Sequence, residues 1–329
     1  MASIDSAWIL IGGVGLGISL TARYLAPNKI LIPKPLLIGV AVLGMGNLSA
    51  VLGAVWWGNG NWALTFSSVF WIVPAIGVMI LADERVFPWL VVFGFVHALF
   101  IIYAELFLPP DALTYNSGLT YNSNVAAGIL VLTGIIGIYK RYPLWIPIVF
   151  LLAIAFTQSR WALLLYSSLI LAGCLTGRLD WRWLLGLAIG AILLMTVTDL
   201  TYRGYHSVEP TLLTDAARDI KIRLSFPDAP DLLPHGLVEH RGLHNVPFRM
   251  ARESGLISGV VWVGLSVWAL TRGRGSVWWW LMLGVVGLSM LDYYTWRPHL
   301  GAFWFLALGG IFLRVDKIKL GAVCDPKIR

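Results

Sequence analysis

The sequence predicts an all-α protein: a polytopic transmembrane helical bundle of about eleven spans, with one large extracytoplasmic loop between the eighth and ninth spans. The first observation is composition, because the 329 residues are 58% hydrophobic and only 12% charged, whereas an ordinary soluble domain has about 25% charged residues. The second is that apolar runs long enough to cross a membrane fill most of the chain. The third is that one long polar stretch, 200–254, interrupts them. We therefore expect a single integral membrane domain over 1–329, with its chemistry in the 200–254 loop.

The apolar runs define the expected spans in chain order. They lie near 7–25, 36–56, 62–82, 87–107, 123–139, 143–158, 160–176, 181–199, 255–271, 275–292 and 298–314. Several are short for a bilayer, and the neighbours 143–158 and 160–176 form either two spans or one broken or re-entrant pair.

Basic residues orient this bundle, because Lys and Arg in short loops are retained on the cytoplasmic side. One set of alternate connections, together with the C-terminal tail, holds fifteen of them: Arg23, Lys29, Lys34, Arg85, Lys140, Arg141, Arg178, Arg182, Arg272, Arg274, Arg314, Lys317, Lys319, Lys327 and Arg329. We therefore expect the C-terminus in the cytoplasm and both the N-terminus and the 200–254 loop outside. The formal charge of +7 follows mostly from this topology, and no RNA- or DNA-binding motif is recognisable. The two cysteines, Cys174 and Cys324, have no metal-ligand spacing.

His244 is the sharpest candidate for chemistry. Asn245 is a good N-cap residue and Pro247 is tolerated in a first helical turn, so a helix is predicted to start here. It would continue through Arg249 and Glu253, an i,i+4 pair, into the ninth span. The partial positive charge of a helix N-terminus disfavours an imidazolium, which would keep His244 neutral and able to act as a general base. The competing interpretation is an ordinary surface histidine.

Three arginines could hold an anionic ligand. Arg160 lies between two apolar runs, where an arginine needs a partner, a cavity or an anion, unless it extends to the membrane surface. Arg218 and Arg223 belong to the predicted amphipathic helix 214–224. This helix either lies on the membrane surface or presents an arginine to a phosphate, whose oxygens suit the guanidinium.

Together these residues resemble the O-antigen ligase/polymerase superfamily of bacterial envelope glycosyltransferases. The family's hallmark is His-Asn in a large periplasmic loop, followed about ten residues later by the Gly that begins the next span, as in His244-Asn245 and Gly255. Weaker similarities are Asn122-Ser123-Asn124 at a span start, Ser159-Arg160, the loop arginines Arg218 and Arg223, and Leu233-Pro234-His235-Gly236. The ligases commonly have a small residue three positions after the Gly; this chain has Ser258 there and Gly259 next. The resemblance covers about 118–310, and family members usually have one more span.

The resemblance implies a function. A metal-independent, inverting transfer would move a glycan from an undecaprenyl diphosphate carrier to an acceptor hydroxyl, at the bacterial inner membrane and without a cofactor. His244 would be the catalytic base. Residues expected to bind the diphosphate or the substrates are Arg160, Arg218, Arg223, Arg241, Asn245, Arg249 and Glu253. The other partners would be membrane lipids and the acceptor, with no nucleic acid.

Two further questions stay open from the sequence. A ligase would use the lipid A core as acceptor, whereas a polymerase would use a carrier-linked glycan. Polymerases often show loop motifs of Arg, ten residues and Gly, which are not found from the loop arginines here, so ligase is favoured. Outside this family, a membrane transporter or a non-catalytic subunit of a membrane complex is the alternative. His97 would be the deep polar residue of a transporter, although a core histidine is the simpler interpretation.

Overall fold

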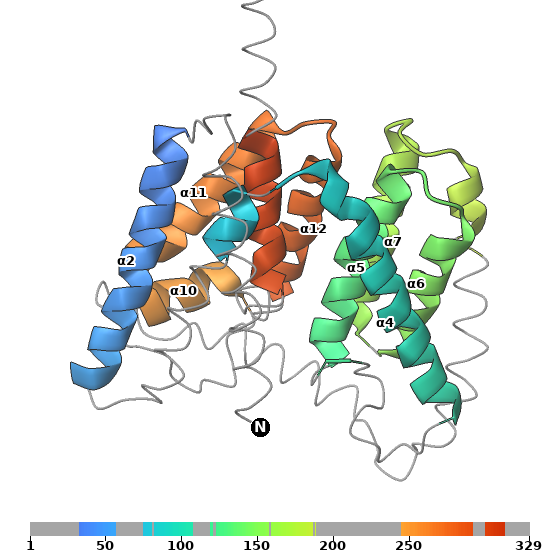
Figure 1. Cartoon of the computed structure of the whole chain (residues 1–329), viewed down its shortest axis with the longest axis horizontal. Helices are drawn as coiled ribbons and strands as arrows, with labels where there is room; N and C mark the ends of the chain where they lie inside the picture. Colours follow the sequence, from blue (N-terminus) through green and yellow to red (C-terminus); the bar gives the residue numbers. More distant parts are fainter. Residues whose placement is uncertain are drawn as a thin grey trace, which may run out of the picture. The chain divides into compact units, whose positions relative to one another are not determined.

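The computed structural model describes residues 33–56, 75–80, 82–107, 119–120, 123–157, 159–186, 188, 245–291 and 300–312. Every regular element among these residues is helical, which confirms the all-α class for the described part of the chain (Figure 1). The number of spans and the placement of the loop stay predictions.

The described helices are α2 (Lys34–Trp56), the short 3-10 helix η1 (Glu84–Val86), α4 (Phe87–Phe107), α5 (Ser123–Tyr139), α6 (Trp145–Phe156), α7 (Arg160–Leu175), α10 (Val246–Ser254), α11 (Leu256–Arg272) and α12 (Val277–Leu291). Apart from η1 and α10, they agree closely with the apolar runs. Helical residues also occur at 75–80 and 182–186, and at Leu300–Phe312. The predicted span 7–25, and most of 62–82 and 181–199, lie outside the described residues.

Two of these segments, Lys34–Leu52 and Glu84–Phe107, are long and apolar enough to cross a membrane by length and composition. The other apolar helices have 10–17 residues. The shortest labelled one, α6, has 12 residues and is therefore about 18 Å long, against about 30 Å for a bilayer core. Its length is compatible with the broken or re-entrant interpretation of 143–158 with 160–176.

The chain divides into two compact units. Unit 1 contains the described residues up to Phe87 and from 245 onward, and unit 2 contains the described residues from Pro88 to 188. The single integral membrane domain stays a prediction.

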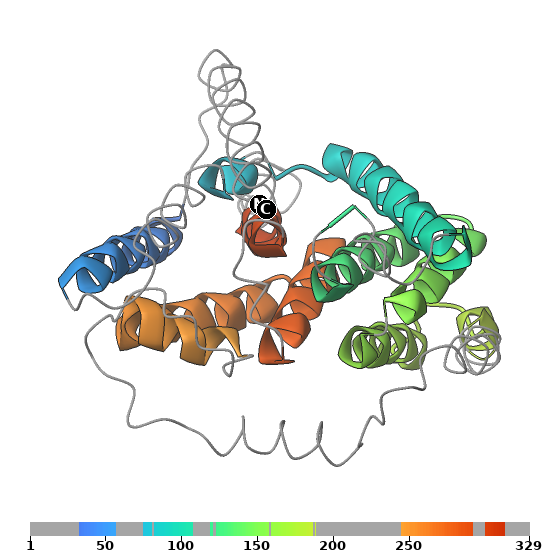
Figure 2. The same ribbon diagram turned by 90° about the horizontal axis from the view of Figure 1, so that it is seen from below.

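The centre of unit 2 is α5, which is buried continuously from Val125 to Ile138. It lies between α4 on one side and α6 and α7 on the other (Figure 2). Close packing follows from small residues, since a Cβ at Gly134 would lie 2.7 Å from the Tyr166 hydroxyl. That hydroxyl donates to the Pro147 carbonyl at 3.4 Å and so ties α7 to α6.

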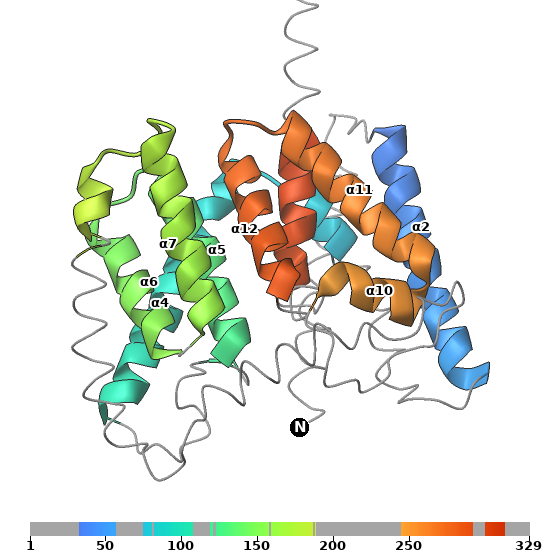
Figure 3. The ribbon, with the colours of Figure 1, turned by 180° about the vertical axis from the view of Figure 1, so that it is seen from behind.

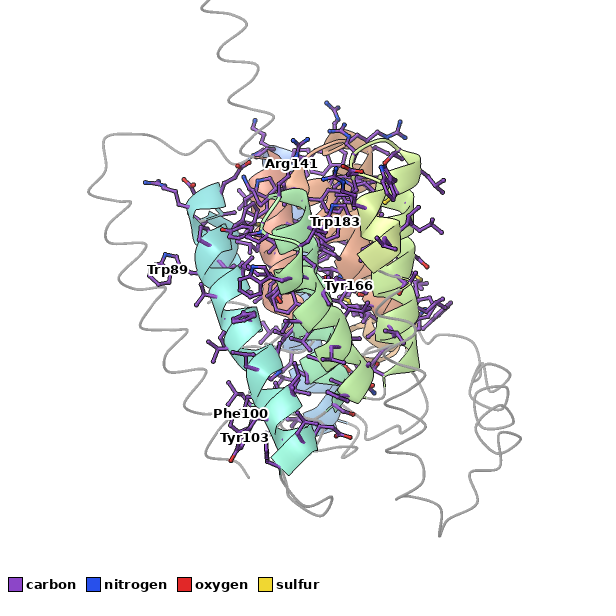
Figure 4. All side chains as sticks on the ribbon, turned by 90° about the vertical axis from the view of Figure 1, so that its right-hand side faces the viewer. Trp89, Phe100, Tyr103, Arg141, Tyr166 and Trp183 are labelled. Atoms are coloured by element: carbon purple, nitrogen blue, oxygen red, sulfur yellow. The ribbon has the colours of Figure 1, made fainter. Side chains whose placement is uncertain are left out.

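The outward face of α4 is apolar. Its exposed large side chains recur at helical spacing along the helix: Trp89, Val92, Phe93, Val96, Leu99, Tyr103, Leu106 and Phe107. Figure 4 shows Trp89 and Tyr103 projecting away from the ribbon while Tyr166 lies among the helices. A helix that is apolar all round is typical of a protein core or a membrane span.

In unit 1, α11 contacts α2, α10 and α12. A Cβ at Gly39 of α2 would lie 2.8 Å from Leu265 of α11, so this glycine allows a close approach of the two helices. Trp262 of α11 stacks on Trp304, with ring centroids 5.8 Å apart. The Trp304 indole N–H donates to the Ser266 hydroxyl at 2.9 Å, which joins the helix Leu300–Phe312 to α11.

Candidate functional site

The helix predicted to follow His244 is present as α10, and its start is capped as expected. Asn245 has an extended backbone (φ −113°, ψ 123°) and its side chain accepts a hydrogen bond from the Phe248 N–H at 3.4 Å. Pro247 occupies the first turn, where its missing N–H leaves no intrahelical bond unmade. The N-cap and the proline position are therefore confirmed.

The other end of the Asn245 amide makes a contact that the sequence did not reveal. Its Nδ2 donates to the Met290 carbonyl at 3.1 Å, one residue before α12 ends at Leu291. The last carbonyls of a helix have no intrahelical donor, so Asn245 satisfies one of them. The two residues are 45 positions apart, which puts this contact beyond any local sequence pattern.

Arg249 and Glu253 form the predicted i,i+4 pair inside unit 1. Their Nε and Oε1 atoms are 2.6 Å apart, and the side chains are only 10% and 8% exposed. A buried ion pair stabilises only when its geometry and remaining hydrogen bonds offset desolvation. Burial favours an internal, structural role for these residues, and their predicted role in substrate binding stays a prediction.

The prediction of one continuous helix into the ninth span is wrong. α10 ends at Ser254, Gly255 has φ 89° and ψ 154°, and α11 restarts at Leu256. Side chains with a Cβ rarely adopt this conformation, so the glycine permits the break. As a result α10 lies across the end of unit 1 and runs in a different direction from α11 (Figures 1 and 3).

Small and polar residues hold the junction of α10, α11 and α2. A Cβ at Gly259 would lie 2.7 Å from the Pro247 carbonyl oxygen, and one at Gly46 would collide with the Ser258 hydroxyl. Ser258, three residues after Gly255, is therefore small because α2 passes directly against it.

Asn47 of α2 is a buried polar residue that the sequence reasoning missed. Its Oδ1 accepts a hydrogen bond from the Ser254 hydroxyl at 3.2 Å, while its Nδ2 is buried without a hydrogen-bond partner among the described residues. The sequence did contain a sign of this contact, since Asn47 is a single amide within an apolar run. A polar group inside a membrane span needs a partner.

In unit 2, the two fragments that resembled the family lie at helix starts. α5 begins at Ser123 and α7 at Arg160, and both helices begin at the same end of unit 2 (Figures 1 and 3). Ser159 precedes α7 and donates its N–H to the Thr157 hydroxyl at 3.4 Å. The partial positive charges of two helix starts favour an anion at this end, although the position of the Arg160 side chain is outside the description.

Four predicted site residues lie outside the described part of the chain: His244, Arg218, Arg223 and Arg241. The predicted amphipathic helix 214–224 lies outside it as well. The structure thus brings together Asn245, Arg249 and Glu253, all on or beside α10. No protein-family model, curated protein or solved structure matches this chain.

Proposed function

We propose that this chain is a membrane-embedded, metal-independent inverting glycosyltransferase. It would move a glycan from an undecaprenyl diphosphate carrier to an acceptor hydroxyl, most simply the lipid A core, as an O-antigen ligase does. The observation that carries the proposal is the capped, anchored start of α10: Asn245 holds both Phe248 and Met290, and His244 is the residue directly before it in the chain.

The reaction needs one base and a means to hold the leaving group. His244 would take the proton of the acceptor hydroxyl, whose oxygen forms a new bond to the anomeric carbon. The bond from that carbon to the diphosphate breaks at the opposite face, so the configuration inverts. Arg160, Arg218, Arg223 and Arg241 would offset the charge of the departing diphosphate, the role that fixed cations have at developing negative charge elsewhere.

The arrangement of helix ends supports the proposed topology. In unit 1, the end of α2, the start of α11 and the end of α12 lie at one end, where α10 also lies (Figures 1 and 3). In unit 2, the end of α4 and the starts of α5 and α7 share one end. The charge pattern assigns all six of these helix ends to the outer side. Within each unit, the helix ends expected outside therefore lie together, as the proposed topology requires.

A transfer assay tests the proposal. Purified protein would receive an undecaprenyl diphosphate-linked glycan with EDTA present, and the lipid A core and a carrier-linked glycan would be offered separately. His244→Ala should lose transfer, while His240→Ala, a change of another histidine in the same loop, should retain it. Wild-type transfer should also fall at acid pH, below the ordinary imidazole pKa of about 6.5, because the start of α10 disfavours the imidazolium form of His244.

Each outcome discriminates. Transfer to the lipid A core identifies a ligase, and transfer to the carrier-linked glycan identifies a polymerase. Transfer that disappears with EDTA would contradict metal independence. Transfer that persists in His244→Ala would show that His244 is not the catalytic base. If neither acceptor receives glycan, the proposed enzyme activity is contradicted.

One observation favours transport as the second candidate. His97 is fully buried in α4, its Nδ1 accepts the Leu119 N–H at 3.3 Å, and its Nε2 has no hydrogen-bond partner in the described residues. If transport were the function, His97→Gln should impair substrate uptake into vesicles and His244→Ala should not. The enzyme proposal expects the reverse dependence for glycan transfer.

A further inference from the structure

We propose that Asn245 is a positioning residue that joins the start of α10 to the end of α12, and not a ligand of the substrate. This inference rests on the proposed function, because what it positions is the segment that begins with His244. It changes the role that the sequence predicted for Asn245.

The first support is that both ends of the amide are engaged by the protein. Oδ1 accepts the Phe248 N–H, and Nδ2 donates to the Met290 carbonyl, with the Met290 sulfur 3.9 Å away. One side chain therefore satisfies an orphan donor of one helix and an orphan acceptor of another.

The second support is chemical, because few side chains can do both. Asp offers the acceptor for the N-cap but has no donor, and its charge would face the partial negative end of α12. Ser offers an N-cap acceptor on a shorter side chain. Ala offers neither. The link to α12 therefore requires an amide of the length of asparagine.

The consequence concerns geometry at the reaction centre. A base must lie within hydrogen-bond reach of the proton that it removes, and an error of about 1 Å in placement can cost about 100-fold in rate. His244 is bonded to Asn245, so fixing Asn245 against α12 restricts where the histidine backbone can go. Loss of the link should reduce the rate of the chemical step more than the binding of the donor.

Steady-state transfer kinetics separate the two roles. Asn245→Ser and Asn245→Asp keep an N-cap acceptor and remove the α12 link, and Asn245→Ala removes both. The matched control is Ser276→Ala, which removes the hydroxyl that accepts the Trp279 N–H at the opposite end of α12. We expect kcat to fall by about 10- to 100-fold in Asn245→Ser with KM for the donor unchanged, and little change in Ser276→Ala. A raised KM with unchanged kcat in Asn245→Ser would make Asn245 a substrate ligand and overturn the proposal.

A distance measurement tests the link without any activity. Spin labels at Phe248→Cys and Met290→Cys, both exposed positions, would be placed in a background with Cys174→Ser and Cys324→Ser. We expect a narrow distribution of distances with Asn245 and a broad one with Asn245→Ser. An unchanged distribution would overturn the proposed link even if kcat fell. If the wild type transfers no glycan, the proposed function fails, and the distance distributions still decide whether Asn245 joins the two helices.

Discussion

At the residue scale, the backbone angle of Gly255 separates α10 from α11. With φ 89° and ψ 154°, this residue lies in a region that is nearly restricted to glycine, and a side chain there costs about 1–3 kcal/mol. Gly255→Ala should therefore lower the thermal unfolding temperature of the detergent-solubilised protein and reduce transfer, since α10 can no longer leave α11 at the same angle.

The control for this prediction is a glycine inside α11, the helix that follows Gly255. Gly264 of α11 has no atom within 4 Å of an added Cβ, and alanine in a helix interior is favoured over glycine by about 0.5–1 kcal/mol. Gly264→Ala should leave the unfolding temperature unchanged or raise it. Equal destabilisation by the two changes would show that the angle at Gly255 is not what matters.

Local contacts at this scale could be predicted and distant ones could not. Asn245 as an N-cap and Arg249 with Glu253 follow from spacings of three and four residues, which a helix brings together by its own geometry. The contacts of Asn245 with Met290 and of Asn47 with Ser254 join residues 45 and 207 positions apart. Those pairings depend on how whole helices pack, which the spacing of residues along one helix does not fix.

At the element scale, α10 carries the buried ion pair of Arg249 and Glu253. Replacing these residues distinguishes a structural role of the pair from a role in substrate binding. Removing one partner of a buried ion pair takes away an interaction that offsets the desolvation of the other, and typically costs about 3–5 kcal/mol, whereas replacing both by apolar residues is often close to neutral. Arg249→Ala should therefore destabilise strongly, and the double variant Arg249→Met with Glu253→Leu should be much less destabilised. The measurement is the thermal unfolding temperature of Arg249→Ala, of Glu253→Ala and of the double variant.

Transfer activity of the same double variant gives the second readout. A structural pair predicts that activity recovers with stability, because only the packing of α10 was at stake. A stable double variant without transfer would show instead that Arg249 or Glu253 meets the substrate, as the sequence predicted.

Element boundaries could be predicted where a long apolar run has a polar edge. α4 and α5 occupy the predicted 87–107 and 123–139, because their runs are bounded by charged or turn-forming residues. The break between α10 and α11 was missed because one glycine inside a helical pattern is commonly tolerated. The break depends on how α11 packs against α2 and α10. The residues around Gly255 in the sequence do not reveal that packing.

At the scale of the whole molecule, the charge pattern predicts which loops face outward. Cys324 lies in the tail expected inside, and Ser207→Cys would lie in the loop expected outside. In intact cells, a membrane-impermeant maleimide should label Ser207→Cys, in a background with Cys174→Ser, without labelling Cys324. Permeabilised cells should give labelling of both.

The reverse pattern would invert the topology and place His244 on the cytoplasmic side. An enzyme that uses a carrier-linked glycan outside the cytoplasm would then be ruled out, whatever the fold of α10. This measurement needs no substrate, so it is independent of the transfer assay.

The nine residues of α10 have one further consequence. One end is hydrogen-bonded to α12 through Asn245, and the other is hydrogen-bonded to α2 through Ser254 and Asn47. The helix therefore links two fixed contacts, and its length must match the distance between them. At 1.5 Å per residue it spans about 13 Å, and one inserted residue would rotate everything beyond it by about 100°. An alanine inserted after Met250 would turn Arg249 away from Glu253 or pull Asn245 off α12. The number of residues between His244-Asn245 and Gly255 is therefore set by the distance between these two contacts. We expect a single insertion there to reduce stability more than most substitutions in the same segment.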